Sequence, residues 1–101
     1  MYRGTTPTIT IEVDVDLTGA SYVVMTLEDF SKNEVNVDNK SGLLEITPTS
    51  VSGKFTQAQT LSLGKGSAKA QIRAIDASGN AIASNVVSLR IEDILKDGEI
   101  P

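Results

Sequence analysis

The stretch from Gly66 to Glu92 constrains the fold of this chain most strongly, because both of its ends alternate between apolar and polar residues. In its first part the apolar positions are Ala68, Ala70, Ile72 and Ala74. In its last part they are Val87, Leu89 and Ile91. A period of two residues is typical of a β-strand that buries one face and exposes the other. Between the two parts, Asp76–Asn80 supplies an aspartate and a glycine suited to a tight turn. The sequence therefore predicts a β-hairpin.

The length of the hairpin loop decides which side chains share a face. A loop of two or four residues places Ile72 on the same face as the apolar row in residues 87–91. A loop of three or five residues places Ile72 with Ile82 and Val86 instead, and leaves that row in water. We therefore predict an even-numbered loop. Ile82 and Val86 then point away from the core, which indicates either a bulge or a second contact surface.

Composition limits the chemistry open to the chain, which has 101 residues and neither cysteine nor histidine. This length suits one domain whose core needs no disulfide or metal. The missing cysteine removes disulfides, thiolate metal sites and a cysteine nucleophile, and the missing histidine removes the commonest general base. Most hydrolase and zinc chemistries are therefore excluded. We expect a protein that is not an enzyme, with no catalytic residue, cofactor or metal site.

Charge and hydropathy bear on the partners. The chain carries 13 acidic and 9 basic residues, a net charge of −4, without long runs of one sign. Nucleic acid binding needs a clustered cationic surface, so we expect no nucleic acid partner. No apolar stretch approaches the ~20 residues that span a bilayer, and residues 1–8 lack the apolar segment of a secretory signal. We expect no membrane partner and folding in the cytoplasm.

The rest of the chain also reads mostly as strands. Further strands are predicted at residues 9–16, 22–27, 34–38 and 43–47. The continuous apolar run at 22–27 indicates a central strand covered on both faces. Residues 49–53 are polar and predict a connection, and residues 55–63 fit a helical turn followed by a short strand.

About seven short strands separated by turn residues predict an all-β fold with less than about one-tenth helix. The architecture that we expect is an immunoglobulin-like antiparallel β-sandwich without a disulfide, spanning residues 9–92. Residues 1–8 form an extended N-terminal arm, because Pro7 restrains the preceding residue to an extended conformation. Residues 93–101 form a C-terminal extension with neither a helical nor a strand period.

The two extensions supply the candidate interaction residues. Apolar residues in a tail without a partner element leave it frayed unless it docks. We therefore predict that the extensions contact neighbouring molecules and that the protein is a homo-oligomer. The alternative is a tail that folds back on its own sandwich. The candidate residues are Arg3, Thr5, Pro7, Ile94, Leu95 and Ile100.

An acidic row is the remaining candidate site. Glu12, Asp14 and Asp16 lie on one face of the first predicted strand, about 6–7 Å apart. Such oxygen-rich rows can hold calcium, or they can form a solvated outer face that discourages pairing between strand edges. A single flat strand cannot wrap an ion, which favours the solvated face.

Four segments together resemble a known group of proteins. They are Arg3–Thr8, Ala70–Arg73, Asp76–Ser84 and Asp93–Leu95. In this order and spacing the chain resembles small structural proteins of tailed phages and prophages of low-GC Gram-positive bacteria. The resemblance implies a virion structural or assembly component that is made in the cytoplasm of the bacterial host. Its partners would be other phage structural proteins, bound without catalysis.

A second function remains open beside this one. A β-sandwich of this size could be a module that binds carbohydrate or a host surface. Sugar sites usually present aromatic platforms, whereas this chain has two tyrosines, two phenylalanines and no tryptophan. An enzyme is the third candidate, and no constellation of residues supports it.

Overall fold

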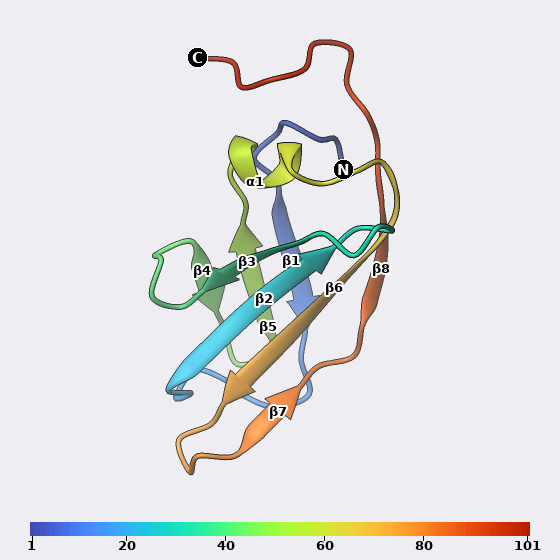
Figure 1. Cartoon of the computed structure of the whole chain (residues 1–101). Coiled ribbons are helices and arrows are strands. Elements are labelled where there is room, and N and C mark those ends of the chain that lie inside the picture. Colours follow the sequence, from blue (N-terminus) through green and yellow to red (C-terminus); the bar gives the residue numbers. More distant parts are fainter.

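Two antiparallel β-sheets make up most of the molecule (Figure 1). The computed structural model describes residues 1–101, with 45% of them in strands and 5% in helix, which confirms the expected low helix content. The elements in chain order are β1 (Thr8–Glu12), β2 (Tyr22–Glu28), β3 (Glu34–Asp38), β4 (Leu44–Ile46), β5 (Ser50–Lys54), α1 (Gln57–Leu61), β6 (Gly66–Ile75), β7 (Ala81–Ala83) and β8 (Val87–Ile91).

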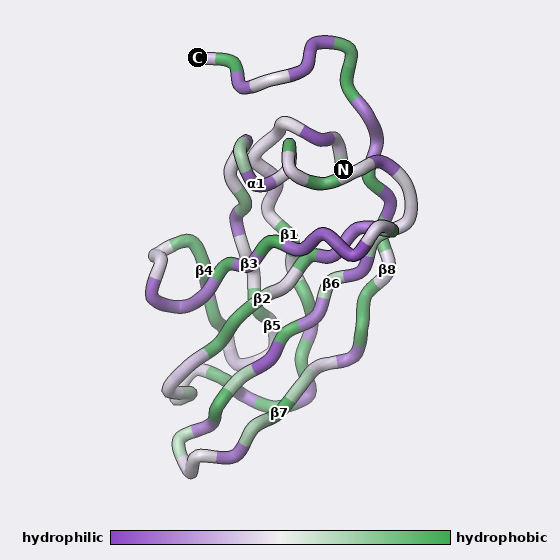
Figure 2. The backbone as a smooth tube through the Cα atoms, in the orientation of Figure 1, coloured by the Kyte–Doolittle hydropathy of each residue, from purple (hydrophilic) through white to green (hydrophobic).

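The sheets are arranged like the two layers of a β-sandwich. The smaller sheet has the order β1-β5-β4, and the larger has the order β3-β2-β6-β7, with β8 also paired to β6. Apolar side chains from both sheets meet in one buried core, because successive strand residues point to opposite faces. Figure 2 shows the resulting change of hydropathy back and forth along β6. The largest fully buried side chains include Phe55, Ile11, Met25, Leu27 and Ile72.

The expected polar connection at residues 49–53 is wrong, because β5 is the central strand of the smaller sheet. The strand looks polar because Val51 is its only large apolar residue. A Cβ atom on Gly53 would lie 2.8 Å from Val37 Cγ1 and 2.9 Å from Met25 Sδ. Glycine is therefore the residue that lets the two sheets approach here.

The first predicted strand is shorter than expected. β1 ends at Glu12, and Val15 is 52% exposed. The carboxylate of Asp16 accepts hydrogen bonds from the backbone and the hydroxyl of Thr18, at 3.0 and 2.7 Å. These local hydrogen bonds favour a turn, so the alternating residues after Glu12 do not continue the strand that pairs with β5.

β2 lies between β3 and β6, as expected of a central strand. Its expected coverage on both faces is wrong. Only Val23, Met25 and Leu27 are buried, and the residues between them are half-buried. The larger sheet therefore keeps one face toward solvent.

The predicted even-numbered hairpin loop is also wrong. Ile75 pairs with Ala81 and Ala74 pairs with Ile82, so residues 76–80 form a loop of five. Further along β6, however, Ala70 pairs with Val87. The register therefore shifts by one residue between β7 and β8.

A bulge at Asn85 and Val86, directly after Ser84, produces this shift. Asn85 and Val86 together stand opposite the single residue Gln71. The Ser84 N–H donates to the Ile72 carbonyl at 2.9 Å, and the Ile72 N–H donates to Ser84 Oγ at 2.9 Å. The serine hydroxyl thus replaces a missing backbone acceptor. Because of the bulge, Ile82 of β7 and Leu89 and Ile91 of β8 all pack on the core, whereas Val87 is 38% exposed.

Two hairpin loops share the pattern Asp-x-Ser-x-Asn, at Asp29–Asn33 and Asp76–Asn80. In each loop the aspartate Oδ1 accepts from the backbone N–H groups two and four residues later, at 2.9 Å. The fourth residue has a positive φ in both, 72° at Lys32 and 85° at Gly79. Because β2 and β6 are antiparallel, the two loops lie at opposite ends of the larger sheet.

Asp29 differs from its counterpart because it is buried. Its Oδ2 accepts from the Asn33 amide at 3.0 Å and from the backbone N–H of Gly64 at 2.8 Å. Burial raises the pKa of Asp29, but the hydrogen bonds from Asn33, Gly64 and Ser31 outweigh it and leave the pKa below its ordinary value. The ionised carboxylate therefore ties the β2–β3 loop to the segment that enters β6.

Candidate interaction site formed by the two arms

The N-terminal arm extends the larger sheet beside the end of β8. The Met1 nitrogen donates to the Arg90 carbonyl at 2.8 Å. The Glu92 N–H donates to the Met1 carbonyl at 2.7 Å, and the Arg3 N–H donates to the Glu92 carbonyl at 3.0 Å. The pairing is parallel. The arm and the start of the tail are therefore held side by side.

The side chain of Arg3 joins three segments and is only 17% exposed. Its Nε donates to the Leu63 carbonyl at 2.7 Å, and its Nη2 donates to the Leu61 carbonyl at 2.8 Å. Its Nη1 donates to Asp93 Oδ1 at 2.9 Å, and Asp97 Oδ1 lies 3.6 Å from Nη2. The planar, multiply donating guanidinium suits this role, which a lysine ammonium could not fill.

Thr5 and Pro7 hold the arm against α1 through their backbone. The buried hydroxyl of Thr60 donates to the Thr5 carbonyl at 2.9 Å. The Phe55 N–H donates to the Pro7 carbonyl at 3.1 Å. These two predicted interaction residues thus make contacts within the chain.

The helical turn expected in residues 55–63 is present as α1, and the strand expected after it is absent. Thr56 caps the helix: Gln59 N–H donates to Thr56 Oγ1 at 3.2 Å, and Thr56 N–H donates to Gln59 Oε1 at 3.0 Å. This reciprocal pair is a capping box, which favours helix over strand at this point.

The tail crosses above α1, at the same end of the molecule as the N-terminal arm (Figure 1). Its Ile94 packs over Gly4, where a Cβ atom would lie 2.8 Å from Ile94 Cδ1. The Gln57 amide donates to the Ile100 carbonyl at 3.0 Å, and the Ile100 N–H donates to Gln57 Oε1 at 3.0 Å. Leu95 is fully exposed, and Ile100 remains 57% exposed. The tail therefore touches its own domain at its base, at Asp97 and at Ile100, and leaves the Leu95 side chain free.

Electrostatics strengthen the attachment at the base of the tail. The backbone N–H of Ile94, the guanidinium of Arg3 and the charge of Lys65 hold the pKa of Asp93 below its ordinary value. Asp93 therefore stays ionised and paired with Arg3 at neutral pH.

The structure thus brings five of the six predicted residues into contacts around α1 and leaves Leu95 free. Gln57, which holds the end of the tail, was missed by sequence reasoning. The only signal for it was the predicted helical turn. The exposed apolar side chains of the two arms are Tyr2, Leu95 and Ile100.

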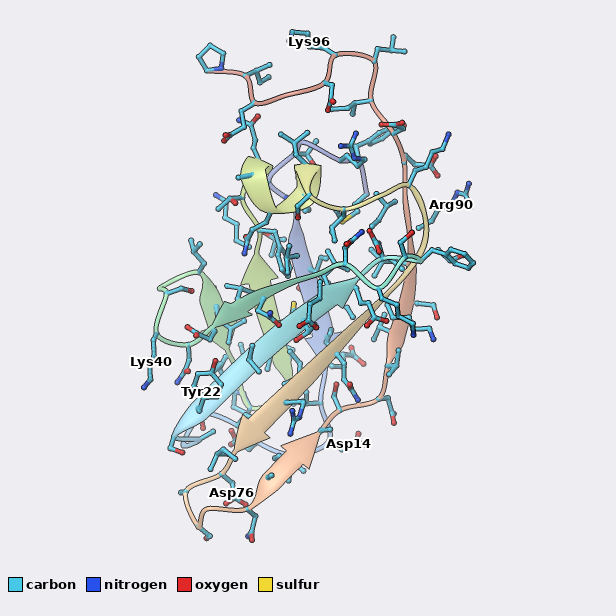
Figure 3. The ribbon with its side chains drawn as sticks, viewed as in Figure 1. Asp14, Tyr22, Lys40, Asp76, Arg90 and Lys96 are labelled. Atoms are coloured by element: carbon cyan, nitrogen blue, oxygen red, sulfur yellow. The ribbon has the colours of Figure 1, made fainter.

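The acidic row lies away from this site. Asp14 and Asp76 lie toward one end of the molecule, and Arg90 and Lys96 toward the other (Figure 3). Hydrogen bonds from Thr18 to Asp16 hold the pKa of Asp16 below its ordinary value. No group of three or more Asp, Glu, His or Cys side chains is gathered closely enough to hold a metal ion.

Replacement of Arg3 by methionine is expected to free the tail and to destabilise the fold by about 2 kcal/mol, because charge-assisted hydrogen bonds to part-buried carbonyls are lost. Amide hydrogen exchange of residues 93–100 and urea unfolding measure the two effects. Arg90→Met is the matched control, since Arg90 is exposed and its side chain pairs only with Glu92. Equal exchange rates in the two variants would contradict the role of Arg3.

Comparison with models of known protein families, with curated proteins and with solved structures finds no match to this chain. None of its helices has the length and apolar character needed to cross a membrane.

Proposed function

We propose that this chain is a structural or assembly component of a tailed phage or prophage particle. It acts through contacts with other phage structural proteins, without catalysis, and resides in the virion after synthesis in the host cytoplasm. The phage assignment rests on the sequence resemblance of residues 3–8, 70–73, 76–84 and 93–95.

The observation that carries the contact role is the meeting of the two arms at one end of the molecule. Both arms lie on the same small helix and leave Tyr2, Leu95 and Ile100 exposed there. Exposed apolar side chains on extended segments are suited to contacts between subunits.

The proposal includes an immunoglobulin-like topology. In that fold, strands B, E and D belong to one sheet and strands C, F and G to the other, with C′ added in some members. The order β1-β5-β4 corresponds to B-E-D, and the order β3-β2-β6 followed by β7 and β8 corresponds to C′-C-F-G. In this proposed assignment the bulged β7–β8 pair counts as one strand, which makes seven from the eight strands of the structure.

Particles purified from an induced bacterial culture that encodes this chain test the proposal. Mass spectrometry of the particles is expected to find the chain in a fixed ratio to the other structural proteins. Deletion of its coding region is expected to stop assembly at one stage, and a wild-type copy supplied from a plasmid restores it. Complete, infectious particles without the chain would overturn the proposal, and binding of the purified chain to host glycans would then favour the surface-binding module.

A further inference from the structure

The attachment of the tail divides it into a fixed base and a loosely held outer part. The base is fixed because the backbone of Glu92 pairs with Met1 and Arg3. The carboxylate of the next residue, Asp93, also accepts a hydrogen bond from the Arg3 guanidinium. Ile94 adds an apolar contact over Gly4. The outer part, residues 95–101, is held only by the Gln57 amide at Ile100 and by Asp97 at the edge of Arg3.

These outer contacts are weak ones in water. Asp97 is mostly exposed and its carboxylate lies 3.6 Å from the guanidinium, so solvent screens the pair. The two hydrogen bonds to Gln57 replace bonds to water, and they hold a segment that loses conformational freedom when it docks. Leu95 gains no burial from this arrangement. The outer part of the tail therefore exchanges readily between docked and free states.

Gln57 recognises the backbone of the tail rather than a side chain, through one donor and one acceptor. An identical tail on a second molecule offers the same N–H and C=O groups and the same acidic residue for Arg3. Every outer contact seen within the chain is therefore available between two copies.

We infer that residues 95–101 dock on Gln57 of a second copy of this chain, by exchange of tails, an inference that rests on the proposed assembly function. The tail and its docking site lie at the same end of the molecule (Figure 1). Reciprocal exchange uses the same surface on both copies and closes a two-fold dimer, whereas a site at the opposite end would give an open chain. Leu95 and the exposed side chain of Ile100 lie at the contact between the two copies.

Concentration sets when exchange occurs. A short tether gives its own tail an effective concentration in the millimolar range. At about 1 mM protein, or when an assembling particle holds copies side by side, roughly half of the occupied docking sites hold the tail of a neighbour.

Paramagnetic relaxation in a mixture of two full-length samples tests this. One sample is labelled with nitrogen-15, and the other carries a spin label on Leu95→Cys, a unique thiol because the chain has no cysteine. Leu95 makes no buried contact, so the variant folds. The total protein concentration is about 1 mM, which matches the effective concentration of a short tether. We expect selective broadening of the amide signals of residues 57–61 in the nitrogen-15-labelled copy. Sedimentation of the unmodified chain is expected to show dimers and no larger species.

Two controls sharpen the experiment. A spin label on Ala77→Cys, in the exposed loop at the other end of the sheet, is expected to leave residues 57–61 sharp. Gln57→Ala in the nitrogen-15-labelled copy removes both hydrogen bonds to the tail and is expected to abolish most of the broadening. Uniform broadening, no broadening at 1 mM, or growth beyond a dimer would overturn tail exchange.

The outcomes separate this inference from the proposed function. Particles that contain the chain, together with no broadening at residues 57–61, would leave the assembly role standing and remove tail exchange. Broadening at residues 57–61, together with complete particles that lack the chain, would retain self-association and remove the phage role.

Discussion

Replacement of Asp29 with alanine is expected to lower the free energy of unfolding by at least about 3 kcal/mol, because each unsatisfied buried group costs about 1–3 kcal/mol. The carboxylate accepts from the backbone of Ser31, Asn33 and Gly64 and from the Asn33 amide, and it is buried. Alanine leaves those donors without an acceptor. Urea unfolding followed by far-ultraviolet circular dichroism measures the loss.

Asp76→Ala is the matched control for this substitution. Asp76 has the same position in the second Asp-x-Ser-x-Asn loop, but that loop is exposed and water can replace the carboxylate. The loss at Asp76 is therefore expected to be clearly smaller. Equal losses would show that the loop pattern, and not the buried link to Gly64, provides the stability.

The pH dependence of stability follows from the same residue. The folded-state pKa of Asp29 lies below the ordinary value of 3.8. The contribution of the ionised Asp29 to the free energy of unfolding is therefore fully present above pH 3.8 and is lost as the pH falls through the lower, folded-state pKa. Asp29→Asn is expected to unfold more readily at neutral pH and to lose less stability between pH 5 and pH 2 than the wild type.

Ile72→Ala is expected to destabilise the fold by about 2–5 kcal/mol, as large-to-small substitutions in a packed core do. Ile72 is almost fully buried on β6, between Met25 of β2 and Ser84, the residue before the bulge. Arg73→Ala, one residue further on the exposed face, is expected to change stability by no more than ~0.5 kcal/mol. The same urea titration serves both variants, and a larger loss at Arg73 would invert the assignment of faces.

The alternation of apolar and polar residues predicted the strands that bury one face. It failed where a glycine or a bulge, and not the hydrophobic pattern, determines how the strands pair. β3 begins and ends where the sequence indicated, and β2 differs by one residue. β5 was missed because Gly53 contributes close approach of the sheets instead of hydrophobic surface. The loop length was predicted wrongly because the prediction assumed pairing without a bulge, whereas the register shifts by one residue opposite Gln71. The positions of Ile82 and Val86 indicated a bulge as one of two possibilities, but the role of the Ser84 hydroxyl in place of a backbone acceptor left no mark in the hydrophobic pattern.

The sequence named residues of the two arms as contacts to neighbouring molecules, and the structure shows the contacts that five of them make within the chain. Arg3 and Ile94 were singled out because they lie in the two extensions, outside the strand pattern, and both make contacts in the site. Their partners could not be derived, because the carbonyls of Leu61 and Leu63 and the amide of Gln57 become available only once α1 has formed beside the arm. The repeated Asp-x-Ser-x-Asn pattern was visible in the sequence and would have identified Asp29.

The parallel pairing of the N-terminal arm with β8 has a mechanical consequence. Tension applied between the arm and the tail pulls the two segments in opposite directions along their length. The three backbone hydrogen bonds that join Met1 and Arg3 to Arg90 and Glu92 are then loaded together in shear, and not one after another as in the peeling of a hairpin. The guanidinium of Arg3 bridges the same junction. Pulling forces transmitted through the two arms are thus carried at one end of the molecule, and the buried core between the sheets is spared.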